Sequence, residues 1–495
     1  YKDLKKTSIV GKLTHLYTGN GSTQALNLGV GFIDFTVNNS VGAWLDRSGG
    51  AGTFGTFKDD SNNTITSFDI ALPQDKFIGA FDIKGRDTAY NHSTTDGLRG
   101  ALLYLNSNSS GAEADGTGSN VASFNTNGIT VGSFGQVNEN TKTYVLDATI
   151  YTHVKGGVTD GVQWIEAYNP VTGNGLRLRE GSNSVTAMPH SLGKEIALSV
   201  TKRLNSANGG LVYYGDKDRR LELFINSGIG GSGLTNSWNH VKPTDSIFSF
   251  EGDNTAVNQL GGVYLDRYFA NSDYQELINY GGTGATGNEI STSFMSRRVT
   301  LKRIDAASEY SLYDNKRGTT RALFLDTSGV ESTSNFMRMV FTPKNIRIDS
   351  TSVDGNTLGG QYIAIVEADT HKDGGDTYFN FSLCNCANTY KLTKIKTSDS
   401  VFTIPYYDEN YETTFEYGVK EEVSILKSIQ LKNLKENSTT IQELSSYNFN
   451  KTLKKSYIFD SKKRVMRETT SGTDIEKRVT KYVYEDKINE EGQTY

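Results

Sequence analysis

The chain has 495 residues, a formal net charge of -5 at pH 7 and a pI near 5.8. This acidic balance argues against a nucleic-acid partner, because neutralising phosphates requires a basic surface, and no apolar stretch approaches the length needed for insertion into a membrane. With 51 glycines, 6 prolines and 11% aromatic residues, the composition indicates a turn-rich, mainly β protein of about three or four domains.

Three strand-like segments recur in the same order three times along the chain. The first segment of each copy ends in basic residues, the second closes on a small polar residue, and the third is aromatic and aliphatic. The first segments are residues 77–87, 195–205 and 297–305, the second 102–106, 221–226 and 322–326, and the third 143–147, 262–266 and 361–365. The spacing indicates an internal repeat of roughly a hundred residues, enough for each copy to fold as a unit. We expect Lys84, Lys202 and Lys302 to lie on equivalent strands.

The predicted fold is mainly β, with tandem β-sandwich-like modules and an additional antiparallel β-rich C-terminal module. The expected boundaries are residues 1–155 for module 1, 156–272 for module 2, 273–389 for module 3 and 390–495 for the C-terminal module. Module 1 is longer than the other two because it contains an inserted loop at residues 38–72.

The start of the chain has the pattern of a β-hairpin. Residues 16–21 and 25–35 are typical of two strands joined by a turn, and Asn and Gly tolerate the positive φ that such turns demand. Further on, the glycines of residues 48–55 are not followed by the Lys-Ser/Thr of a phosphate-binding loop. We therefore expect a flexible surface loop there.

Two groups of residues have the side chains of hydrolases. His92, Ser93 and Asp96 are the residue types of a catalytic triad, but they lack a nucleophile elbow, and the matching stretch of the third copy has no histidine. A surface or turn histidine is the preferred interpretation. Asp216, Asp218 and Glu222 would need to face each other across a cleft to hydrolyse a glycoside, whereas a turn of mixed charge favours solvated surface.

Two further patterns suggest metal sites. The oxygen-rich residues 59–64 and 373–376 lack the spacing of a recognised calcium loop and favour solvated turns. Cys384 and Cys386 would share one face of a strand, and even with His371 they supply too few ligands for structural zinc. We expect these cysteines to be neither joined to each other nor bound to metal. The sequence thus predicts no catalytic, cofactor-binding or metal-binding residues, and no cofactor.

Beyond about residue 390 the composition changes, because glycine nearly disappears while Lys and Glu become dense. Residues 455–460, 464–468 and 477–484 alternate apolar and charged residues and predict a meander of antiparallel strands. A coiled coil is the alternative for residues 423–435, although that segment mixes both periods and is short for supercoiling. We expect this module to mediate assembly.

Residues 84–92, 96–100 and 123–132, with 313–316 and 361–364 of the third copy, carry a family resemblance. They resemble a repeated domain of unknown function found in tail and virion proteins of bacteriophages. The resemblance covers about residues 12–370 in three copies, and it departs from the family in the insertion at residues 38–72. It implies a context, a virion appendage or surface structural protein, and no chemistry.

The expected function is therefore that of a non-enzymatic structural protein of a bacteriophage virion, a tail fibre, spike or similar appendage at the virion surface. Repeats that do not retain His, Cys or paired carboxylates suggest that shape is the repeated property. The expected partners are other virion subunits and further copies of the chain in a homo-oligomer, with a host surface glycan or receptor as an additional candidate. The alternatives are a subunit of an extracellular or cell-surface filament and, third, a polysaccharide depolymerase.

Overall fold

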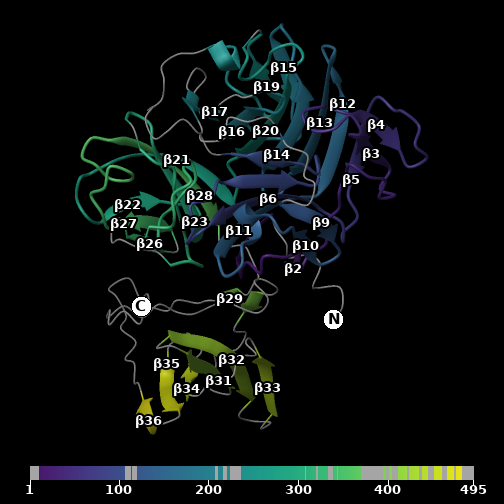
Figure 1. Cartoon of the computed structure of the whole chain (residues 1–495). Helices are drawn as coiled ribbons and strands as arrows, with labels where there is room; N and C mark the ends of the chain where they lie inside the picture. The colour runs from purple at the N-terminus through teal and green to yellow at the C-terminus, as the bar shows by residue number, and fades with distance from the viewer. Residues whose placement is uncertain are drawn as a thin grey trace, which may run out of the picture. The chain divides into compact units, whose positions relative to one another are not determined.

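The structure is a computed structural model of the chain (Figure 1). It describes residues 11–105, 113, 120–206, 210–215, 220–222, 236–252, 254–306, 308–318, 321–332, 338–342 and 344–368 and, beyond them, only the backbone of strands. The chain divides into two compact units, one of Ile9–Thr370 and one of Tyr1–Ser8 with His371–Tyr495. The expected mainly β fold is confirmed, since almost every element of both units is an antiparallel strand.

The first unit contains three β-sandwiches, each made of a larger and a smaller sheet. In sandwich 1 the larger sheet has the order β1 (Lys12–Thr18), β11 (Thr143–Tyr151), β6 (Ile78–Gly85), β7 (Ser93–Asp96) and β8 (Leu102–Tyr104). The smaller sheet has the order β2 (Gln24–Asn27), β10 (Gly128–Val131) and β9 (Val121–Asn125). Phe81 of β6, Leu146 of β11 and Ile129 of β10 belong to one buried cluster, so the two sheets enclose an apolar core.

Sandwich 3 repeats this arrangement strand for strand. Its larger sheet has the order β21 (Gln275–Gly281), β28 (Gln361–Ala368), β23 (Ser296–Arg303), β24 (Ser311–Asp314) and β25 (Leu323–Phe324). Its smaller sheet has the order β22 (Asn288–Ser291), β27 (Asn345–Ile348) and β26 (Met339–Phe341). Val299, Ile346 and Val366 are fully buried between these two sheets.

Sandwich 2 contains the same order within an eight-stranded sheet. That sheet runs β18 (Arg220–Glu222), β17 (Leu211–Tyr214), β16 (Ile196–Arg203), β20 (Val263–Ala270), β14 (Asn174–Glu180), β13 (Val162–Asn169), β12 (His153–Thr159) and β5 (Phe68–Ala71). It packs on the pair β15 (Thr186–Pro189) and β19 (Ile247–Phe250) through a core that includes Trp238 and Phe248. The last strand, β5, comes from the insertion after β2.

The register of the sheets confirms that the three lysine strands are equivalent. Lys84 of β6 lies opposite Val145, Lys202 of β16 lies opposite Leu265, and Lys302 of β23 lies opposite Ile363. Each of these partners directly follows a tyrosine, namely Tyr144, Tyr264 and Tyr362. The same two strands therefore meet in the same register in all three sandwiches.

One expectation for the start of the chain is wrong. The predicted hairpin does not form, because β1 pairs with β11 in one sheet and β2 pairs with β10 in the other. The amide of Gly19 donates to the carbonyl of Lys142 at 2.8 Å, and that of Gly21 donates to Asn138 at 2.9 Å, so the turn is held by the loop before β11 and crosses between sheets.

The insertion at residues 38–72, expected as a loop, contains three strands. β3 (Ala43–Asp46) and β4 (Thr56–Asp59) form a hairpin, and β5 pairs with β12. The buried Leu45 and Phe57 of this hairpin belong to the largest apolar cluster among the described residues, which explains why the insertion is ordered against the sandwiches.

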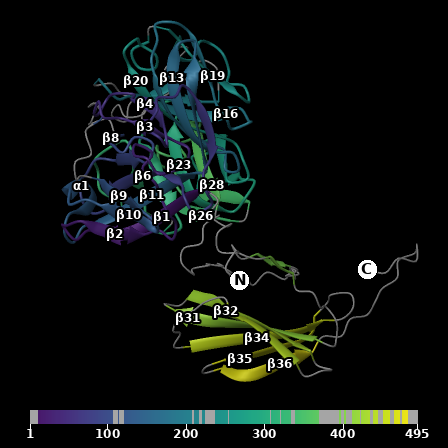
Figure 2. The same ribbon diagram turned by 90° about the vertical axis from the view of Figure 1, so that its right-hand side faces the viewer.

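The second unit contains a six-stranded antiparallel sheet (Figure 2). Its order is β33 (Ser438–Glu443), β32 (Val423–Asn433), β31 (Tyr411–Lys420), β34 (Lys451–Phe459), β35 (Val465–Gly472) and β36 (Ile475–Lys481), and a separate pair consists of β29 (Lys394–Lys396) and β30 (Val401–Thr403). The predicted meander is confirmed by β34, β35 and β36. The coiled-coil alternative for residues 423–435 is wrong, because β32 occupies that segment.

Candidate functional site

A buried asparagine and a buried tyrosine, six residues apart, recur in every sandwich. The pairs are Asn138 and Tyr144, Asn258 and Tyr264, and Asn356 and Tyr362, each with 0% relative exposure. The tyrosine hydroxyls donate to the carbonyls of Gly135, Thr255 and Val353 at 2.6, 3.0 and 2.9 Å. They also accept from the amides of Glu139, Gln259 and Thr357 at 2.9, 2.8 and 2.9 Å. Each tyrosine therefore closes the loop that leads into its own strand.

The asparagines tie that loop to the turn that leads from the larger sheet to the smaller sheet. Asn356 donates to the carbonyls of Ala285 and Ser350, both at 2.7 Å, and accepts from the Thr283 amide at 2.8 Å. Asn138 and Asn258 make the same type of bonds to residues 20–22 and 182–186. The sequence reasoning missed this set, although the spacing Asn-x5-Tyr ends on the tyrosine of the third segment in every copy and could have signalled it.

A second buried motif occurs in sandwiches 1 and 3. Its spacing is Asp-x2-Arg-x13-Glu, represented by Asp96, Arg99 and Glu113 and by Asp314, Arg317 and Glu331. The Nε atoms of Arg99 and Arg317 donate to the aspartates of their own motifs at 2.7 and 2.6 Å, and both arginines also bind the glutamates. In sandwich 2, Tyr214 occupies the position of Asp96, so the motif is not retained there.

The glutamates of this motif also join neighbouring sandwiches. The amide of Glu331 in sandwich 3 donates to the carbonyl of Arg86 in sandwich 1 at 2.7 Å. The amide of Glu113 in sandwich 1 donates to the carbonyl of Leu204 in sandwich 2 at 2.6 Å. Arg86 and Leu204 both stand two residues after the equivalent lysines. Sandwich 1 therefore meets sandwich 3 in the same way as sandwich 2 meets sandwich 1.

At each of these two joints between sandwiches, a further arginine binds the glutamate. This arginine comes from a different segment at each joint. Arg86 binds both carboxylate oxygens of Glu331, at 2.9 and 3.1 Å. At the other joint the equivalent residue is the apolar Leu204, and Arg47 from the insertion binds Glu113 instead, at 2.6 and 3.3 Å. The insertion thus supplies an ion pair that the neighbouring sandwich cannot make.

Further ion pairs lie where the three larger sheets meet. Arg267 of β20 binds Asp82 of β6 at 2.6 and 2.7 Å, and Arg298 of β23 binds Asp147 of β11 at 3.1 Å and Glu367 of β28 at 2.8 Å. Burial disfavours the charged form of Asp82, but Arg267 outweighs this effect and holds the pKa well below its usual range. The arginines and Lys12 do the same for the pKa of Glu367. Asp82 and Glu367 are therefore charged, whereas burial raises the pKa of Asp147. All three carboxylates bind arginines of neighbouring strands.

The candidate triad residues are adjacent but serve other purposes. The Ser93 hydroxyl donates to the carbonyl of Ile83 at 3.2 Å, and Asp96 is bound by Arg99. His92 is buried, with 8% relative exposure, so the expectation of a surface histidine is wrong, and the residue lies in the connection between β6 and β7. Burial lowers its pKa to about 4, and Lys84 and Arg267 act in the same direction against the attraction of Asp82.

The other candidates fall partly outside the described residues. Asp216, Asp218, His371, residues 373–376, Cys384 and Cys386 lie outside them, and only the backbone of Glu222 is described, in β18. Asp59 accepts from the amide of Asn63 at 2.8 Å and so closes the turn after β4. Within the described ranges no cluster of three metal-ligating side chains occurs, and no helix is long and apolar enough to span a membrane.

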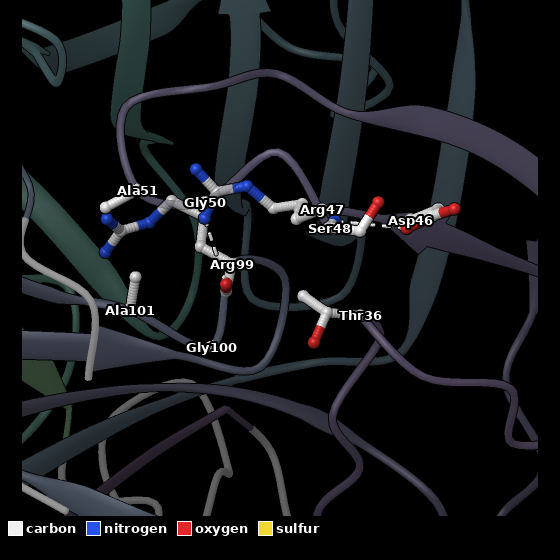
Figure 3. A pocket seen from close by; sticks show the side chains of 9 residues that line it. All are labelled: Thr36, Asp46, Arg47, Ser48, Gly50, Ala51, Arg99, Gly100 and Ala101. Carbon is white, nitrogen blue, oxygen red and sulfur yellow. Dashed lines mark hydrogen bonds between the residues drawn. The ribbon is translucent and has the colours of Figure 1, made fainter. Parts of the chain in front are cut away.

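A polar pocket of about 320 Å³ lies beside the joint between sandwiches 1 and 2. It is lined by Thr36, Asp46, Arg47, Ser48, Gly50, Ala51, Arg99, Gly100 and Ala101 (Figure 3). Arg47 crosses it to donate to the carbonyl of Arg99 at 3.0 Å. The loop at residues 48–55, expected to be a flexible surface loop, is tied down at Gly52, whose amide donates to Glu113 at 2.8 Å.

Comparisons with known proteins give one finding. Neither the curated proteins nor the solved structures include a match to this chain. A family model matches residues 77–370, more than half of the chain, and includes every strand of the three larger sheets except β1 and β5. The chain therefore belongs to the family described as a domain of unknown function (DUF7483).

Proposed function

We propose that the chain is a non-enzymatic structural protein of a bacteriophage virion, a tail fibre, spike or similar appendage at the virion surface. The observation that carries this proposal is the use of buried charge. Asp82, Asp147, Glu331 and Glu367 each bind an arginine of another strand or another sandwich. A buried charge that lost its partner would be strongly destabilising. These ion pairs therefore fix the strands and sandwiches in one arrangement, as a structural protein requires.

The apolar core supports the same role. The largest apolar cluster contains Ala80 from sandwich 1, Leu265 from sandwich 2 and Ile363 from sandwich 3. The three sandwiches surround this common centre (Figure 1). A body built in this way is rigid across its joints, because relative motion of two sandwiches would expose apolar surface and separate ion pairs. A rigid body of this kind suits a structural subunit of an appendage, which has to keep its shape.

The virion context rests on the resemblance of residues 84–92 and 96–100 to the repeated domain of phage tail and virion proteins. We propose further that the segment after residue 390 attaches the chain to other virion subunits and to copies of itself, and that the sandwiches form the displayed body. A host surface glycan or receptor would then be met by the sandwiches.

Immunogold labelling of native phage particles, with an antibody raised against residues 9–370, tests this proposal. We expect gold at a tail or other surface appendage. Gold along filaments on uninfected cells would contradict the virion assignment and support the alternative, a subunit of a cell-surface filament. Release of oligosaccharides when the purified protein is incubated with host capsular glycans would instead establish a depolymerase.

A further inference from the structure

The pocket beside Arg47 has the size of a small-molecule site. Its volume of about 320 Å³ lies at the lower end of the roughly 300–1,000 Å³ that ligand pockets span. Two arginines line it, which at first sight suggests a site for phosphate or another anion. The hydrogen bonds of Arg47 and the carboxylates around Arg99 argue against an anion site.

Every N–H of the Arg47 guanidinium is already used. Its Nε donates to the carbonyl of Thr53 at 3.2 Å, its Nη1 donates to Arg99 at 3.0 Å and to Glu113 at 3.3 Å, and its Nη2 donates to Thr53 at 2.7 Å and to Glu113 at 2.6 Å. An arginine has five N–H donors, so none remains for a ligand.

Arg99 differs, because only its Nε and Nη1 make hydrogen bonds and its Nη2 makes none, but two carboxylates compensate its charge. Its guanidinium is fully buried and lies against Asp96 and Glu113, with Nη2 at 2.6 Å from Asp96. The two arginines and these two carboxylates balance in charge. Asp46, on the wall of the pocket, adds a further negative charge, and the site therefore repels anions.

The groups that remain for a ligand are mostly acceptors, and the Ser48 hydroxyl can also donate. The Thr36 hydroxyl donates its proton to Asp34 at 2.6 Å, which leaves the lone pairs of Thr36 to accept. Asp46 uses one carboxylate oxygen for the Ser48 amide at 3.0 Å, and its second oxygen and the exposed Ser48 hydroxyl complete the set. A ligand rich in hydroxyl donors fits such a surface.

The acceptors are held in place by the ion pairs. Asp46 and Ser48 flank Arg47 in the chain, and the five bonds of Arg47 fix the backbone between them. Rigid positioning lowers the entropic cost of binding. We propose that this pocket binds a neutral saccharide of about one or two sugar rings, whose hydroxyl groups donate to Asp46, Thr36 and Ser48.

This inference rests on the proposed function, because it specifies the chemistry of the host contact. The test uses the full chain and the methyl glycosides of glucose, galactose, mannose, rhamnose and N-acetylglucosamine, followed by saturation-transfer NMR and calorimetric titration. Sodium phosphate, sodium sulfate and calcium chloride serve as charged probes. We expect at least one glycoside to bind and the anions not to bind.

Two variants of the same hairpin locate the binding. Asp46→Ala removes an acceptor from the pocket and should weaken glycoside binding by about tenfold or more, as expected for the loss of a hydrogen bond to a charged group. Asp60→Ala is the matched control, because the exposed Asp60 also accepts a backbone amide, that of Gly42 at 2.9 Å, but lies outside the pocket. The control should bind as the wild type does.

The inference is overturned if no glycoside binds, if phosphate, sulfate or calcium binds in their place, or if Asp46→Ala binds glycoside as tightly as Asp60→Ala. Each of these results leaves the structural proposal standing, because immunogold labelling reports the position of the chain in the particle independently of any ligand. Gold on cellular filaments would refute that structural proposal and leave the measured sugar binding unchanged.

Discussion

Three asparagines hold equivalent loops in the three sandwiches, and each is completely buried. A buried amide is tolerated only where its donors and acceptors are satisfied. Asn356 meets this condition with bonds to Ser350, Ala285 and Thr283. The same residue type at the same distance from a tyrosine in each copy makes this the most regular polar feature of the protein.

We expect Asn356→Ala to lower the free energy of unfolding by about 1–3 kcal/mol, because the buried carbonyl of Ser350 would lose its donor. Differential scanning calorimetry of the full chain measures the effect. Asn271→Ala is the control, since the exposed Asn271 accepts a single bond from the Leu277 amide at 2.9 Å and its loss should cost less than about 1 kcal/mol. Equal costs for the two variants would contradict the structural role of Asn356.

His92 predicts a pH dependence of stability. Its pKa is lowered to about 4 by burial, while histidine in an unfolded chain titrates near 6.5. Between these two values the unfolded chain binds a proton that the folded chain does not, so stability falls as the pH is lowered from about 6.5 to about 4. His190, whose pKa burial also lowers to about 4, contributes in the same direction.

We expect His92→Gln to lose part of this pH dependence. Urea unfolding at several pH values between 4 and 7 measures the slope, and His240→Gln, a change at an exposed residue, should leave the slope as it is in the wild type. A His92 variant with the full wild-type slope would show that this buried histidine does not resist protonation.

At the scale of elements, the insertion between β2 and β6 acts as a clamp. Its hairpin places Arg47 on Glu113, at the joint where the equivalent of Arg86 is the apolar Leu204. Its last strand, β5, extends the sheet of sandwich 2. An inserted segment thus joins two sandwiches by one ion pair and one strand pairing.

We expect Arg47→Ala to destabilise the protein by about 3 kcal/mol, because Glu113 would keep its charge in a buried site with one arginine fewer. Lys155→Ala is the control from the neighbouring strand. The ion pair of Lys155 with Asp69 is exposed, with side-chain exposures of 41% and 56%, and its loss should cost less than about 1 kcal/mol. Thermal unfolding of both variants measures the two effects. If Arg47→Ala unfolds at the same temperature as the wild type, the insertion does not stabilise this joint.

At the scale of the whole molecule, the two units differ in their layers. The unit of Ile9–Thr370 contains three sandwiches that enclose their own cores. The described part of the second unit is one six-stranded sheet and one two-stranded pair. A sheet whose strands alternate apolar and charged residues has one face to bury, which is why we assign assembly to this unit.

Deleting residues 390–495 should therefore give a soluble, folded protein that no longer assembles. The sandwiches should keep the thermal transition of the full chain, because their cores and ion pairs lie within Ile9–Thr370. Incorporation into particles, measured by immunoblotting of purified virions, should be lost. A truncated chain that still enters the particle would move attachment to the sandwiches.

The repeat and its strands were determined by the sequence alone, because they depend on local patterns. The basic-ended, small-polar and aromatic segments became β6, β8 and β11 of sandwich 1 and their counterparts in the other two sandwiches. Period-two alternation and polar turns act over a few residues and need no partner to be recognised. The same reasoning identified the meander of β34, β35 and β36.

Tertiary structure decided which strands pair and what the charges do. The hairpin predicted around residues 16–25 does not form, because β1 pairs with β11 instead and this pairing buries Leu13 in the core of sandwich 1. Arg86 and Glu331 stand 245 residues apart, and nothing local in either segment selects the other. Such pairs form only after the sandwiches pack, because burial in a common interface is what makes one carboxylate require one particular arginine.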